Sequence, residues 1–202
     1  NFAFEVVRAA QSDRVTTLQD AVQGVAWLPG AGEYALATTK GHVSGNQTEV
    51  FIDDFSVIEA STDAAVNVHS PSGFSDFTTS LNALQVELPK VQSGLLIASW
   101  FGDDLRCGEC LIRPKVENDA RDNPGQPWSV AGLDRSTAQV VAQLEGRPAY
   151  GGTPTDASVL EAIAALNEAG QAVVFYPFLL MEQIADNGLP DPWSDAMDQP
   201  VL

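Results

Sequence analysis

Two continuous apolar runs constrain the fold of this chain more than any other feature. They are "GLLIASWFG" at residues 94–102 and "QAVVFYPFLLME" at residues 171–182. Neither run alternates between apolar and polar residues, so each is typical of a strand that is buried on both faces, as in a parallel sheet. Both are far too short to cross a membrane as a helix.

The segment between the two runs predicts a helix with clear ends. It reads "TPTDASVLEAIAALNEAG" at residues 153–170, with Thr153 as the expected N-cap, Pro154 in the first turn and Gly170 as the stop signal. The residues expected to form its buried face are Ala157, Leu160, Ile163, Ala164 and Leu166. A strand, a helix and a strand in this order predict a βαβ unit with parallel strands and a right-handed crossover.

A second helix is predicted ahead of the first apolar run. Phe74, Phe77, Leu81, Leu84 and Leu88 recur at spacings of three and four, which indicates one helical stripe. We expect Ser72 or Ser75 to cap this helix and Pro89 to end it. Residues 104–126 are polar and rich in turn signals, so we expect a loop there, followed by a short helix at 136–143.

The first 63 residues have a different texture, with short alternating segments separated by turn signals. These segments are "NFAFEVV", "GVAWLPG", "EYALATTKG" and "TEVFIDDFSVI". They predict a small antiparallel β region at residues 1–63, with a short helix at 16–22. We therefore expect a mixed α/β fold, in which this β region is the end of a larger β domain and residues 64–202 contain βα units. A closed (β/α)₈ barrel takes roughly 250 residues, so at most its opening part is present.

The net charge and the first residues of the chain give further information about possible functions. The chain has 27 acidic and 10 basic side chains and a net charge of −17, which disfavours nucleic acid and anionic membranes as partners. It begins at Asn1 without an initiator methionine, and we expect it to be a segment of a longer polypeptide. No signal peptide is recognised at its start.

Carboxylates follow both apolar runs, where parallel α/β folds place their ligand sites. Asp103 and Asp104 follow the first run, and Glu182 ends the second. Two carboxylates that flank a sugar are the minimal apparatus of a glycosidase, so these three residues are the candidate catalytic groups. The alternative is turn chemistry, in which the aspartates bind nearby backbone amides.

Cys107 and Cys110 form a Cys-x-x-Cys pair inside the predicted loop. Such a pair is compatible with a disulfide, a redox pair or two plain thiols. A zinc site would need two further ligands, and His42 and His69 share no spacing pattern with the pair, so we predict no metal site. The glycines near residues 146–152 fit no phosphate-binding motif, and we expect no cofactor.

Several aromatic side chains could stack on sugar rings or simply belong to the core. The candidates are Trp100, Trp128, Tyr150 and Trp193.

Three long segments carry a resemblance to a known family. They are "SWFGDDLRCGECLIRPKVE", "GRPAYGGTPTDASVLEAIAALNEAGQAVVFYPFLLME" and "NGLPDPWSDAMDQPVL". In this order they resemble the large tail-tip protein, or megatron, of gene transfer agents and related siphophages. This is a glycoside-hydrolase/phage-tail family with a TIM-barrel-like domain, and the resemblance covers residues 64–202.

The resemblance implies a structural component of a tail tip or baseplate in an extracellular, virion-like particle. Such a component would assemble with hub proteins as a homotrimer around the tail axis and contribute to attachment to, or penetration of, the host cell envelope. Two alternatives are an active glycoside hydrolase acting on peptidoglycan or cell-surface glycan, and a sugar-binding adhesion module. Glycosidase carboxylates in such barrels usually lie on later strands, so the resemblance supplies no catalytic residue, and we expect this segment not to be an enzyme.

Overall fold

A four-stranded mixed sheet, three of whose strands are parallel, forms the centre of the molecule. The computed structural model describes residues 16–29, 32–43, 47–52, 56–61 and 64–200. The sheet contains β1 (Gly24–Trp27), β6 (Ser93–Gly102) and β14 (Ala172–Met181) in the order β1-β6-β14. β6 and β14 pair along their whole lengths, from Ala172 opposite Ser93 to Met181 opposite Gly102. The two apolar runs therefore form parallel neighbours, as predicted.

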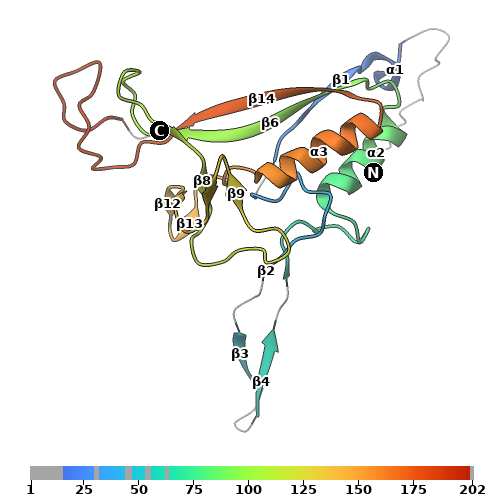
Figure 1. Cartoon of the computed structure of the whole chain (residues 1–202), viewed down its shortest axis with the longest axis horizontal. Coiled ribbons are helices and arrows are strands. Elements are labelled where there is room, and N and C mark those ends of the chain that lie inside the picture. The colour runs from blue at the N-terminus through green and yellow to red at the C-terminus, as the bar shows by residue number, and fades with distance from the viewer. Residues whose placement is uncertain (1–15, 30–31, 44–46, 53–55, 62–63, 201–202) are drawn as a thin grey trace, which may run out of the picture.

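Helices α2 (Asp76–Glu87) and α3 (Asp156–Glu168) connect the three strands in turn. Both lie on the same side of the sheet (Figure 1). The Ser75 hydroxyl accepts a hydrogen bond from the Thr78 amide and caps α2. Thr155, not Thr153, caps α3, because the Thr153 hydroxyl already accepts a hydrogen bond from the Lys115 amide.

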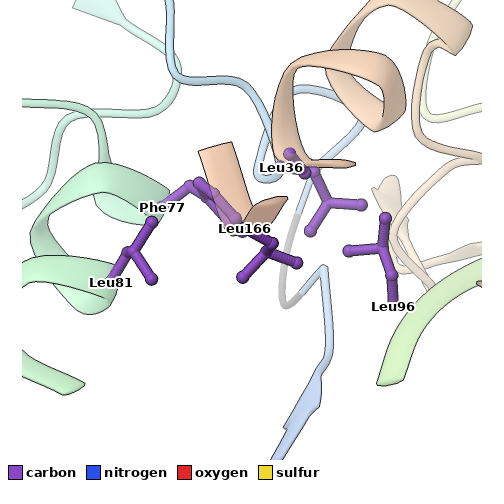
Figure 2. Close-up of a cluster of buried hydrophobic side chains, with 6 residues drawn as sticks. Leu36, Phe77, Leu81, Leu96 and Leu166 are labelled. Carbon is purple, nitrogen blue, oxygen red and sulfur yellow. The ribbon is translucent and has the colours of Figure 1, made fainter. Parts of the chain in front are cut away.

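The main core lies between the two helices and β6. Figure 2 shows this cluster, which consists of Leu36, Phe77, Leu81, Leu96, Ala162 and Leu166. Burying a side chain as large as leucine or phenylalanine stabilises a fold by about 1.5–3 kcal/mol. The predicted α2 stripe is confirmed at Phe77 and Leu81, whereas Phe74 is exposed. On α3, Ala162 and Leu166 are the buried apolar residues. The predicted face is confirmed at Leu166 and was wrong at Ala157, Leu160 and Ala164, which are exposed.

Residues 32–39 are fastened to α3 by hydrogen bonds. The Glu33 carbonyl accepts a bond from the Thr155 amide at 3.0 Å. The Glu161 carboxylate accepts bonds from the amides of Thr38 at 2.7 Å and Thr39 at 2.8 Å. This segment therefore forms turns. The strand expected at "EYALATTKG" is absent there, because the backbone groups of the segment bind α3 instead of a neighbouring strand.

Short elements complete the described part of the chain. The short elements that precede β6 in the chain are α1 (Leu18–Ala21), the antiparallel pair β2 (His42–Val43) and β5 (Ala64–Ala65), and the hairpin of β3 (Gln47–Ile52) and β4 (Ser56–Ser61). In Figure 1 this hairpin extends away from the sheet. After β6 come β7 (Ile112–Arg113), β8 (Lys115–Val116), β9 (Ser129–Val130), β10 (Leu133–Asp134), β11 (Gln139–Val140), β12 (Gln143–Leu144) and β13 (Arg147–Pro148).

The N-terminal predictions had mixed outcomes. Antiparallel pairing is present in β2–β5 and β3–β4, and α1 lies within the helix expected at 16–22. The segment "NFAFEVV" lies outside the described residues. The antiparallel prediction was wrong for "GVAW", because β1 pairs in parallel with β6 and so belongs to the same sheet as the later βα units.

The prediction of a helix at 136–143 was also wrong. The Asp134 side chain accepts hydrogen bonds from the amide and hydroxyl of Thr137, which forms a turn instead of a helix start. Beyond the turn, β11 pairs with β8, and the Val141 amide donates to the Val116 carbonyl. Pairing with a distant strand thus satisfies the backbone groups that a helix would have paired locally.

β14 is the least covered part of the sheet. Val174, Phe175, Tyr176, Phe178 and Leu179 remain 40–54% exposed. The expectation that this run is buried on both faces was wrong. Neighbouring residues such as Val174 and Phe175 point to opposite faces of the sheet and both are about half exposed, so within the described residues neither face of β14 is fully covered. No helix among the described residues is long and apolar enough to cross a membrane.

Candidate functional site at the carboxyl ends of the strands

Asp103 follows the last residue of β6 and closes the loop that leaves it. Its Oδ1 accepts a hydrogen bond from the Leu111 amide at 2.8 Å, and its Oδ2 lies 3.7 Å from Nη1 of Arg113. Arg113 belongs to β7, which pairs antiparallel with the end of β6. Asp103 therefore binds the returning strand of its own loop, as the turn-chemistry alternative expected.

Asp104 is held more tightly. It accepts three hydrogen bonds from Arg106, one from the backbone amide and two from the guanidinium, and one from the Gln199 side-chain amide at 2.7 Å. The Arg106 guanidinium and the Gln199 amide hold the pKa of Asp104 well below its usual range. A carboxylate that stays ionised in this way cannot serve as a general acid near neutral pH.

Glu182 follows β14 and forms a buried ion pair with Lys115 of β8. The two residues are 7% and 8% exposed. Oε1 of Glu182 also accepts a hydrogen bond from the Ala142 amide at 2.6 Å, and the Lys115 ammonium lies 5.9 Å from the centre of the Phe101 ring. This pair fastens the segment after β6 to the end of β14.

The three candidate carboxylates thus lie at one edge of the sheet, as their places in the sequence suggested. The register brings the ends of the two strands together, with Gly102 opposite Met181. Each carboxylate is committed to a local amide or a cation, which leaves no free acid and base that could flank a sugar. Their observed chemistry is the fixing of loops.

The four aromatic candidates are dispersed. Trp128 is 1% exposed, and its indole nitrogen donates to the Thr153 carbonyl at 2.8 Å, so it is a core residue. Trp100 packs against the cluster of Tyr34, Val116, Trp128 and Val130. Tyr150 lies 6.2 Å from the ring of Phe101. Trp193 is 74% exposed, whereas Trp100 and Tyr150 are half-buried.

A second polar network connects residues 32–39 to the loops after β6. The Arg135 guanidinium binds both carboxylate oxygens of Glu33, and both side chains are buried. The Tyr34 hydroxyl donates to Asp122 at 2.6 Å, and burial raises the pKa of this phenol well above its ordinary value. No sequence signal pointed to this network, because Glu33 and Arg135 stand 102 residues apart.

Glu117 lines a small cavity beside this network. The cavity has a volume of about 240 Å³, and its lining includes Glu33, Tyr34, Glu117, Arg121 and Arg135. Burial and the nearby charge of Glu33 raise the pKa of the Glu117 carboxyl, although the Gly152 amide donates to it at 3.2 Å. The Glu117 carboxyl, whose pKa is raised, therefore lies beside a cavity.

Gly152 packs directly against Glu33 of this network, where there is no room for a side chain. A Cβ atom at this position would lie 2.8 Å from Cγ of Glu33 and 3.0 Å from the Lys115 carbonyl oxygen. The absence of a side chain lets the chain pass close to Glu33 just before α3 begins.

Cys107 and Cys110 lie in the loop between Asp104 and Leu111. Cys107 is exposed, Cys110 is half-buried, and both are free thiols. Within the described ranges no group of three or more histidine, cysteine or acidic residues is placed to hold a metal ion.

No protein-family model matches the chain, and no curated protein matches it either. The resemblance to tail-tip proteins therefore depends on the three sequence segments quoted above.

Proposed function

We propose that this chain is a structural segment of a tail-tip or baseplate protein in a phage-like particle and forms the opening part of a TIM-barrel-like domain. The observation that supports this proposal best is the incomplete parallel sheet. Its strands are in sequential order, and both crossover helices lie on one side (Figure 1).

Sequential order with helices on one side favours a barrel over a doubly wound sheet. In a doubly wound fold the strand order reverses and helices cover both faces, whereas in a (β/α)₈ barrel neighbours follow the chain and all helices lie outside. In this sheet Leu96 faces the helices, so Leu95 and Ile97 face the other way together with their partners on β14. The β14 residues on this face are Val174, Tyr176 and Phe178, which pair with Leu95, Ile97 and Ser99.

The uncovered face is suited to the interior of a barrel. Large apolar side chains fill such interiors, and strands of an all-parallel sheet are normally covered on both faces. Among the described residues, the edge of β14 away from β6 has no strand beside it, and a further parallel strand would pair with its backbone groups. We infer that more strands complete the domain in the assembled protein.

The fixed carboxylates support a structural role over catalysis. Asp103, Asp104 and Glu182 all hold loops at the end of the sheet where a barrel enzyme keeps its reactive groups. Three carboxylates that hold loops in this way give a rigid surface suited to contacts with other proteins. The net charge of −17 favours basic partner surfaces among the hub proteins.

Particle association tests the proposal. An antibody raised against this chain would be used for immunogold electron microscopy of particles purified from producing cells, with antibody preabsorbed on the purified chain as the control. We expect gold label at the end of the tail and co-sedimentation of the protein with particles. Protein found only in the soluble cell fraction, with unlabelled particles, would refute the proposal.

A further inference from the structure

We propose that Cys107 and Cys110 form a thiol–disulfide exchange site that reacts with small-molecule disulfides such as oxidised glutathione and closes into a disulfide within the loop after β6. This proposal does not depend on the tail-tip assignment.

The loop backbone brings the two cysteines within reach of each other. The amides of Glu109 and Cys110 donate to the Arg106 carbonyl at 2.9 and 3.0 Å, so residues 106–110 form one tight turn. The bond from the Cys110 amide to the Arg106 carbonyl has the spacing of one helical turn, and residues three apart in a helical turn have Cβ atoms about 5–6 Å apart. A disulfide needs Cβ atoms roughly 3.5–4.5 Å apart, so a small movement of the loop would close the pair. Gly108, between the cysteines, has open space around its Cα.

The ends of the turn are fixed by the two aspartates described above. Asp104 holds the backbone and side chain of Arg106 before Cys107, and Asp103 holds the Leu111 amide after Cys110. Because the flanks are already ordered, closing the disulfide removes little further freedom from the folded chain. This gives the Asp-Asp pair a role that needs no catalysis.

The two thiols differ in environment, which sets the order of reaction. Cys107 is exposed, so its sulfur is the one that a small disulfide can reach. Cys110 is half-buried, and its sulfur packs over Gly102, where an added Cβ would lie 3.0 Å from it and 2.8 Å from the Met181 sulfur. Cys107 therefore attacks first and Cys110 resolves.

The exchange balances without any further reactant. The Cys107 thiolate attacks one sulfur of glutathione disulfide, forms a mixed disulfide and releases one glutathione thiolate. The Cys110 thiolate then attacks the Cys107 sulfur, forms the loop disulfide and releases the second glutathione thiolate. The protein loses two thiol protons and two electrons, and one glutathione disulfide becomes two glutathione thiols.

Intact-mass spectrometry of the whole folded chain tests this scheme. The reduced protein would be incubated with oxidised glutathione, quenched with acid and weighed, and circular dichroism would confirm that each variant is folded. We expect the wild-type protein to lose two hydrogen atoms and keep no glutathione. The Cys110→Ser variant is expected to retain one glutathione, and the Cys107→Ser variant is expected to react far more slowly.

A variant at Asp103 tests whether the fixed ends of the loop speed closure of the disulfide, as opposed to two thiols that react by chance. In Asp103→Ala the Leu111 amide loses its acceptor, so closure should slow and the mixed disulfide should accumulate several-fold over the wild-type protein. Asp119→Ala, at an exposed position outside the loop, is the matched control. Wild-type protein that carries two glutathiones, that stays unmodified, or that closes equally fast with Asp103→Ala would overturn the proposal.

Discussion

The buried pair of Lys115 and Glu182 offers the most direct test of how this chain is held together. The Lys115→Met substitution removes the cation but keeps a chain of similar length. It leaves the Glu182 carboxylate, whose side chain is 3% exposed, without a counter-charge. Breaking a buried ion pair from one side destabilises a protein by about 3–5 kcal/mol, because the remaining charge stays desolvated. We expect a loss of this size in the free energy of unfolding.

The double variant Lys115→Met/Glu182→Gln isolates the cause. A glutamine can still accept the hydrogen bond from the Ala142 amide through its side-chain oxygen, but it carries no charge. If the single variant suffers from an unpaired charge, the double variant should recover most of the loss, because a buried pair and a neutral replacement are often nearly equal in stability.

Urea unfolding followed by tryptophan fluorescence measures these free energies. The Arg113→Met variant is the control, since the Arg113–Asp103 pair is 3.7 Å apart and its side chains are 41% and 35% exposed. Exposed pairs of this kind contribute about 0–1 kcal/mol. A Lys115→Met protein that loses less than about 1 kcal/mol, or a double variant no more stable than the single one, would contradict the assigned burial of the pair.

Three further predictions concern a glycine, a carboxyl and the open face of the sheet. Gly152→Ala should destabilise the protein by about 1–3 kcal/mol in urea unfolding, because its Cβ would collide with Glu33, whereas Gly125→Ala, with its nearest neighbouring atom at 3.5 Å, should have little effect. The pKa of the Glu117 carboxyl is raised in the folded state. The stability that this carboxyl contributes is therefore present below its unfolded pKa and is lost as pH rises through its folded pKa, so Glu117→Gln should be more stable than the wild-type protein at pH 7. That advantage should vanish below about pH 4 in urea titrations, and an advantage that persists there would contradict the assigned cause. Val174→Lys should reduce binding of a hydrophobic dye to the isolated chain, while Val86→Lys, at a site on α2 that is 81% exposed, should leave it unchanged.

Local patterns predicted the centre of the fold, and distant contacts explain the errors. The order of β6, α3 and β14 follows from apolar runs and a capped helix, which are properties of adjacent residues. The choice between Thr153 and Thr155 as N-cap depended on Lys115, a residue far along the chain. β1 has only four residues, so its alternation could not show whether its partner runs parallel or antiparallel.

The candidate site shows the same division. The positions of Asp103, Asp104 and Glu182 at one edge of the sheet were predictable from where the apolar runs end. Their partners were not, since Lys115 and Glu182 are 67 residues apart and Asp104 and Gln199 are 95 apart. Whether a carboxylate is free or fixed is decided by such partners, and only the folded chain brings them together.

The bonds between residues 32–39 and α3 also determine the order in which this protein can fold during synthesis. Thr39 binds Glu161, which lies 122 residues later in the chain. At 5–20 residues per second, a ribosome completes that distance in roughly 6–25 s. Throughout this interval Leu36 cannot contact Ala162 and Leu166 of α3, although Phe77 and Leu81 of α2 have already been synthesised. The hydrogen bonds that fasten residues 32–39 to α3 can therefore form only late in synthesis, after the rest of their cluster has been made.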